Sequence, residues 1–167
     1  MSHMDQETLP EAAKRVADLL AGIGHDRPVV MLPATGKTSA EAAAGLGCSV
    51  AEIAKSIIFR RVEDDAPVLV IASGSNRVDE AKVAARVGAL GKADARFVRE
   101  KTGYAIGGVC PIGHAVPPVM LLDRDLFNYE SLWAAAGHPH AVFNLTPGQL
   151  QQMTGAEVAD VAQDAAP

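Results

Sequence analysis

A lysine at the start of an apolar strand is the first residue that could carry chemistry. Lys55 begins the run KSIIFRRV (55–62), and two-residue alternation places it on the same face as Ile57 and Phe59. An ammonium group at the end of an apolar face is partly desolvated, so it attracts an anionic or carbonyl oxygen more strongly than a lysine in open water. Lys55 is therefore a candidate binding residue, although a lysine extending from a sheet edge into solvent would show the same pattern.

A glycine-rich loop is the second candidate. The segment GYAIGGVCPIGHAVPP (103–118) holds four glycines and three prolines, a composition that excludes a regular helix or strand. Adjacent Gly107 and Gly108 allow several backbone N–H groups to converge on one point, and Pro111 stiffens the turn while removing one donor. Such a loop suits a developing oxyanion. A tight crossover loop without a ligand would have a similar composition.

The other reactive side chains lack the partners that catalysis requires. Cys110 lies in the loop, but no neighbouring base or cation is evident, so we expect it to pack rather than react. Cys48 is distant in sequence, and both cysteines are expected to be free thiols. His114, His138 and His140 could carry protons or contact a substrate, or could be idle turn residues. No pairing typical of a metal site appears, and we expect neither a metal nor a cofactor.

The segment MLPATGKTSAEAAAGLG (31–47) resembles the end of a phosphate-binding P-loop through Gly36-Lys37-Thr38. A P-loop also needs a glycine five residues before Gly36, and that position holds Met31. Thr38 and Glu41 instead form a capping box, which predicts a helix ending near residues 45–47.

Composition limits the classes of partner. The chain has 167 residues, 49% of them hydrophobic, and a net charge of −5, which fits one globular domain and argues against nonspecific coating of nucleic acid. The segment 71–101 is locally basic, with four acidic residues against seven basic ones: Arg77, Lys82, Arg86, Lys92, Arg96, Arg99 and Lys101. This segment could meet a polyanion, or could simply be two solvated helix faces.

Helices are predicted where apolar residues recur every three or four positions and where capping residues precede them. A capping box at Thr8 and Glu11 predicts the start of a helix that ends at Gly22 or Gly24. Ser49 and Glu52 predict a single turn. Further helices are expected over 76–88, 94–103, 129–137 and 146–155, the last with Pro147 at its first position.

Strands are predicted at 27–32, 55–62, 68–73, 119–123, 140–145 and 156–161. The second and third should form a hairpin because the acidic turn between them is short. Strands and helices mix irregularly, and we therefore predict a single α+β domain with a mixed, largely antiparallel central sheet surrounded by short helices.

Three segments together resemble the YbaK/prolyl-tRNA-synthetase-associated domain family of aminoacyl-tRNA deacylases. They are IAKSIIFR (53–60), TGYAIGGVCPIGH (102–114) and AGHPHAVFNLTPGQL (136–150), in this order and at these separations. The resemblance covers essentially the whole chain. It implies a YbaK-like fold similar to the editing domain inserted in bacterial prolyl-tRNA synthetases, and hydrolysis of the ester that joins a wrong amino acid to tRNA.

The resemblance also implies roles for particular residues. The essential lysine of the family falls on Lys55, and its GxxxP loop falls on Gly107 to Pro111. Backbone N–H groups of this loop, which includes Gly108, Val109 and Cys110, would bind the acyl oxygen, with Gly113 supporting the turn. Ser56 falls where some relatives select the amino acid. A polar pocket residue of some relatives falls on His138, with His140 as the alternative.

The partners expected from the resemblance are the acceptor end of a mischarged tRNA and an aminoacyl-tRNA synthetase, with Arg77, Arg96 and Arg99 as tRNA-binding residues. Two other functions stay open: a noncatalytic module that binds tRNA or a synthetase, and a hydrolase of another small ester. Residues 1–4 are interpreted as a remnant of an expression tag, 5–163 as the domain and 164–167 as a tail. Because no apolar run approaches the ~18 residues of a membrane span and no secretion signal is visible, we expect a cytoplasmic protein without membrane contact.

Overall fold

The computed structural model describes residues 9–33 and 38–164. The predicted tag, Thr8 and residues 34–37 of the P-loop-like segment lie outside these ranges. The helices are α1 (Glu11–Gly22), α2 (Ser39–Leu46), α3 (Glu80–Val87), α4 (Ala95–Thr102) and α5 (Pro147–Thr154), with short 3-10 turns η2 (Val50–Glu52) and η3 (Arg124–Asn128). The strands are β1 (Val29–Met31), β2 (Ile53–Arg61), β3 (Pro67–Ser73), β4 (Leu90–Gly91), β5 (Val119–Asp123), β6 (Leu132–Ala135), β7 (Ala141–Leu145) and β8 (Glu157–Ala159).

One mixed sheet organises the domain. The strand order is β1-β7-β6-β2-β3-β5-β8, and β4 pairs with the far end of β2. The pairs β1–β7, β6–β7, β2–β3 and β2–β4 are antiparallel, whereas β2–β6, β3–β5 and β5–β8 are parallel. This arrangement confirms the predicted α+β domain with a mixed sheet and the predicted β2–β3 hairpin.

Most predicted helix ends are confirmed because their caps are local. Side chains of Thr38, Asp79 and Asp94 accept hydrogen bonds from the first turns of α2, α3 and α4, and Gly47 and Gly103 end α2 and α4 with positive φ. Thr146 and Gln149 form the capping box of α5. The first helix differs: it starts at Glu11 after Pro10, with no side-chain cap.

The predicted helix over 129–137 is wrong, because the structure has strand β6 there. Leu132 and Ala134 are buried while Trp133 and Ala135 are partly exposed, which is the alternation of a strand. Pairing of β6 with both β7 and β2 overrides the helix propensity of the alanines. Gly137 is therefore a turn residue rather than a helix terminator. The short elements β4 and η3 were also not predicted.

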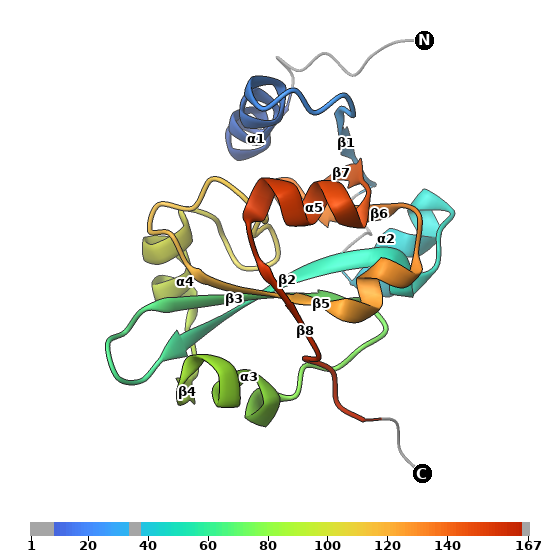
Figure 1. The fold of residues 1–167 in the computed structure, drawn as a ribbon. Coiled ribbons are helices and arrows are strands. Elements are labelled where there is room, and N and C mark those ends of the chain that lie inside the picture. Colours follow the sequence, from blue (N-terminus) through green and yellow to red (C-terminus); the bar gives the residue numbers. More distant parts are fainter. Residues whose placement is uncertain (1–8, 34–37, 165–167) are drawn as a thin grey trace, which may run out of the picture.

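Different helices pack on the two faces of the sheet. Figure 1 shows α5 on one face and α3 on the other. The larger core lies under α1, α5 and the glycine-rich loop and includes Leu69, Tyr104 and Phe143. A smaller core around Val68 and Val83 lies under α3. Among the described helices, none has the length and apolar character that crossing a membrane requires.

Candidate functional site

The site begins where the central strand loses a neighbour. Strand β6 pairs with β2 only at Ile53 and Ala54, and β4 pairs with it only at Arg60 and Arg61. Residues 55–59 of β2 therefore have a sheet partner on the β3 side alone. Lys55 and Ser56 are the first residues of β2 past its pairing with β6.

A cavity of about 200 Å³ lies at this point. Lys55 and Ser56 line it from β2, and Gly107 and Val109 line it from the glycine-rich loop. The structure thus brings together two segments that are about fifty residues apart in the sequence. The remaining wall includes residues from β6, from the β6–β7 turn and from the start of α2: Trp133, Ala134, Ala135, Pro139, Thr38 and Ser39.

Lys55 is held by main-chain oxygen rather than extended into solvent. Its Nζ donates to the carbonyl of Asn76 at 2.6 Å, and the Asn76 amide donates to Asp123 at 2.8 Å and to Asp125 at 2.9 Å. Burial lowers the pKa of Lys55 below its ordinary value, the positive charge of Arg77 lowers it further, and Asp123 opposes both. Arg77 is therefore close enough to Lys55 to act on it electrostatically.

The glycine-rich loop approaches the β6–β7 turn so closely that only glycine fits. A Cβ on Gly108 would lie 2.9 Å from Cα of His138, and Gly107 has φ +90°. The Gly108 N–H donates to the carbonyl of Ala105 at 3.0 Å. Among the described residues, the N–H groups of Gly107 and Val109 have no main-chain hydrogen-bond partner, and both residues line the cavity.

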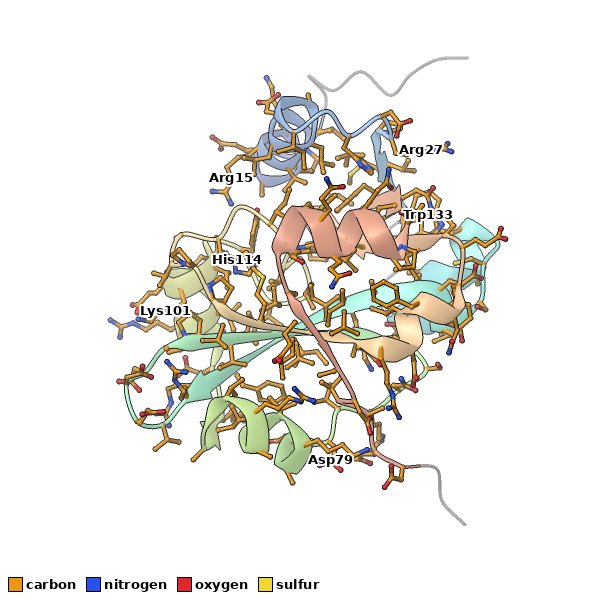
Figure 2. All side chains as sticks on the ribbon, viewed as in Figure 1. Arg15, Arg27, Asp79, Lys101, His114 and Trp133 are labelled. Carbon is orange, nitrogen blue, oxygen red and sulfur yellow. The ribbon has the colours of Figure 1, made fainter. Side chains whose placement is uncertain are left out.

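Side chains behind the loop hold its shape. The Tyr104 hydroxyl donates to the carbonyl of Ile112 at 2.7 Å, and His114 Nε2 lies 2.6 Å from the carbonyl of Cys110. The Arg15 guanidinium stacks on the Tyr104 ring, 4.8 Å from its centroid. Figure 2 shows Arg15 extending from α1 on the side of the molecule that holds His114.

Cys110 is fully buried in this network, and burial raises the pKa of its thiol to about 12. The thiol therefore packs and is not a nucleophile. Neither Cys110 nor Pro111 nor Gly113 lines the cavity. Gly113 has φ +76° and lies against Leu19 and Tyr104, which fits a supporting role.

The two histidines of the β6–β7 turn do not line the cavity, although Pro139 between them does. The ring centroids of His138 and His140 lie 5.6 Å apart, and His138 Nδ1 accepts from the His140 main-chain N–H at 3.1 Å. His138 thus shapes the turn on which Gly108 packs.

The basic segment is more neutralised than its sequence indicates. Lys82 pairs with Asp160 and Asp164, Arg86 with Glu157, and Arg96 with Glu100. Arg99 is exposed on α4. Figure 1 shows α4 near the end of the sheet where β2 and β3 join, whereas α2, which borders the cavity, lies at the opposite end. Of the three predicted tRNA-binding arginines, only Arg77 is near Lys55.

Sequence reasoning missed the wall supplied by β6. Trp133, Ala134 and Ala135 lie in the segment that was predicted as a helix, and Trp133 lies on the side of the molecule near α2 (Figure 2). The AGHPH turn, where a proline and a glycine interrupt the apolar pattern, was the signal that this segment returns toward the loop.

The fold and the cavity together define a class: an α+β domain in which a lysine on the central strand and a glycine-rich loop share one small cavity. A family model for the aminoacyl-tRNA editing domain matches residues 34–153. The chain belongs to this family.

Known proteins similar to this chain support the assignment. An uncharacterised protein, YwhH of Bacillus subtilis (strain 168), is 33% identical over 142 residues, which is 84% of this chain and 90% of that protein. A crystal structure described as a candidate trans-editing enzyme for prolyl tRNA synthetase is 42% identical, with a TM-score of 0.89 over 94% of this chain and 100% of that one. The crystal structure of hypothetical protein APE2540 is 31% identical, with a TM-score of 0.77 over 89% of this chain and 99% of that one.

Proposed function

We propose that the protein is a freestanding trans-editing deacylase that hydrolyses the ester bond between a wrongly attached amino acid and its tRNA. Membership of the editing family and the similarity to a candidate trans-editing enzyme support the substrate class. The observation that carries the proposal is the shared cavity of Lys55, Gly107 and Val109.

The hydrolysis of an aminoacyl ester requires few catalytic side chains. An aminoacyl ester is already activated, so the enzyme must position a water molecule and stabilise the tetrahedral oxyanion. The N–H groups of Gly107 and Val109 would donate to this oxygen, and one such donor is worth roughly 3 to 4 kcal/mol, or about a hundred- to a thousand-fold in rate. Lys55 would hold the negatively charged end of the tRNA or the carbonyl region beside the cavity.

The attacking water needs a base, and the terminal ribose hydroxyl of the tRNA can serve. With the Cys110 thiol buried and protonated, a substrate-supplied base fits the site better than a protein nucleophile. A tRNA ending in 2′-deoxyadenosine should therefore be hydrolysed much more slowly than the normal substrate. Equal rates for the two substrates would reject this assignment of the base.

Such an activity is needed because synthetases have limited selectivity between similar amino acids. A binding pocket separates similar small amino acids by only about 1 to 3 kcal/mol, so errors occur and a second, differently shaped site is needed to remove them. A cavity of about 200 Å³ with mostly apolar walls would admit a small aminoacyl group. A cytoplasmic location and cooperation with an aminoacyl-tRNA synthetase belong to the same proposal.

The decisive experiment incubates the purified protein with a panel of mischarged tRNAs and follows release of the amino acid. We expect at least one to be hydrolysed, and Lys55→Ala to reduce the rate by about a hundredfold, as for removal of a single transition-state interaction. Lys14→Ala, at an exposed position outside both the cavity wall and the basic segment, is the matched control and should retain the rate.

The same assay separates the two other functions. A noncatalytic tRNA- or synthetase-binding module would hydrolyse none of the panel. A hydrolase of another small ester would cleave a model ester without competition from uncharged tRNA, whereas a deacylase should be inhibited by it.

A further inference from the structure

The main chain of β2 presents unpaired polar groups to the cavity. Along an antiparallel strand, the N–H and C=O of one residue point to the same neighbour, and successive residues alternate. The carbonyl of Ile53 accepts from Gly74 and the N–H of Arg61 donates to Ala66, both on the β3 side. Odd-numbered residues of β2 therefore face β3, and Ser56 and Ile58 face the opposite edge.

That opposite edge has no strand at Ser56. The ladder with β6 ends at Ala54, and no main-chain hydrogen bond joins Ser56 to the β6–β7 hairpin in the part of the chain that the structure describes. The ladder with β4 starts again only at Arg60. The described strands thus leave the N–H and C=O of Ser56 without a sheet partner, and Ser56 lines the cavity.

The two sides of the cavity are complementary in hydrogen bonding. The loop offers the N–H donors of Gly107 and Val109, and β2 offers the carbonyl acceptor of Ser56. The described residues that line the cavity include no aspartate or glutamate. A ligand that carries an amino group must therefore find main-chain or hydroxyl oxygen as its acceptor.

We propose that the Ser56 main-chain carbonyl binds the α-amino group of the aminoacyl substrate, while the loop N–H groups bind its carbonyl oxygen. This inference rests on the proposed function and adds a selection rule to it. An α-amino group next to an acyl carbonyl has the same donor and acceptor pattern as one residue of a β-strand, so the acyl group occupies the place that β6 leaves open. Substrates with a free α-amino group are accepted, and N-acylated ones, such as peptidyl esters, are rejected.

The test uses three nonhydrolysable adenosine analogues with an amide in place of the 3′ ester: 3′-alanylamino, 3′-propionylamino and 3′-(N-acetylalanyl)amino-3′-deoxyadenosine. The propionyl compound removes the amino group without adding bulk, and the acetyl compound blocks it. We expect the alanyl analogue to bind about tenfold or more tightly than either, as for the loss of one charge-assisted hydrogen bond. The Ser56 carbonyl ¹³C resonance should shift with the alanyl analogue and not with the propionyl analogue.

Equal binding of the alanyl and propionyl analogues, an unresponsive Ser56 carbonyl, or no binding of the alanyl analogue would each overturn the inference. Failure of this inference can be distinguished from failure of the proposed function. Hydrolysis of alanyl- and propionyl-tRNA at equal rates would keep the deacylase and reject the amine site. Tighter binding of the alanyl analogue, without hydrolysis of any mischarged tRNA, would keep the amine site and reject the deacylase.

Discussion

At the scale of single residues, the site depends on how closely two backbone segments approach. Gly108 touches the main chain of His138, and this contact positions the loop that carries Gly107 and Val109 against the cavity. The composition of the loop predicted a tight turn. It could not predict the partner, because the contact joins segments that are thirty residues apart.

Substitution Gly108→Ala should therefore affect both stability and activity. The new Cβ would lie 2.9 to 3.0 Å from backbone atoms of His138, and such overpacking costs about 1 to 3 kcal/mol. We expect a lower free energy of unfolding and a larger fall in the deacylation rate, measured by denaturant titration and by release of the amino acid. Gly22→Ala, which meets no atom within 4 Å, is the control and should leave the rate unchanged; equal effects of the two substitutions would contradict the close packing.

His114 should make the stability depend on pH. Burial lowers its pKa below the ordinary value of 6.5, and Arg15 lowers it further against the opposing hydrogen bond to Cys110. As pH falls through 6.5, His114 takes up a proton in the unfolded chain before it does so in the folded protein. The folded state therefore loses stability between pH 6.5 and the lower pKa of folded His114. We expect His114→Gln to show a smaller fall in Tm between about pH 7.5 and pH 5 than the wild type. Parallel curves for the two proteins would show that another group titrates.

At the scale of elements, local signals predicted the helices and runs of β-branched residues predicted the strands. The caps at Thr38, Asp79 and Asp94 act within one turn, and for this reason they were readable from the sequence. Strand β6 was not, because its alanines favour a helix locally and only the pairing with β7 and β2 makes it a strand. The error hid three residues of the cavity wall, Trp133, Ala134 and Ala135. The meeting of Lys55 with Gly107 was expected only through the family resemblance.

The capping box of α5 offers a prediction at this scale. Thr146 Oγ1 accepts from the Gln149 N–H at 3.1 Å, and the Gln149 side chain returns a hydrogen bond to Thr146. Thr146→Ala should cost about 1 kcal/mol of unfolding free energy and leave deacylation unchanged, because Thr146 does not line the cavity. A fall in rate at unchanged stability would mean that α5 takes part in the site. Thr146→Ser is the matched control, since serine keeps the capping oxygen.

At the scale of the whole molecule, charge limits how strongly the protein could bind the proposed tRNA substrate. The net charge is −5, and three of the seven basic residues of the segment 71–101 are tied in ion pairs. The attraction to a polyanion must therefore come from few residues and stay modest.

The double substitution Arg96→Ala with Arg99→Ala should weaken tRNA binding and reduce the slope of log affinity against log salt by about one for each phosphate that the variant no longer neutralises. The Arg77→Ala variant is the informative comparison, because Arg77 lies beside Lys55. Binding would be measured at low and at moderate salt. If the double variant binds as the wild type does in both, α4 does not contact the tRNA, and Arg77 is the one of the three predicted arginines left to contribute.

The burial of Cys110 within the glycine-rich loop makes its thiol a probe of loop opening. Cys48 is partly exposed while Cys110 is sealed, so an alkylating reagent should reach the second thiol only during the moments when the loop lifts away from the sheet. The rate of Cys110 modification then reports how often the loop opens. A bound substrate that holds the loop closed would lower this rate without contacting the sulfur.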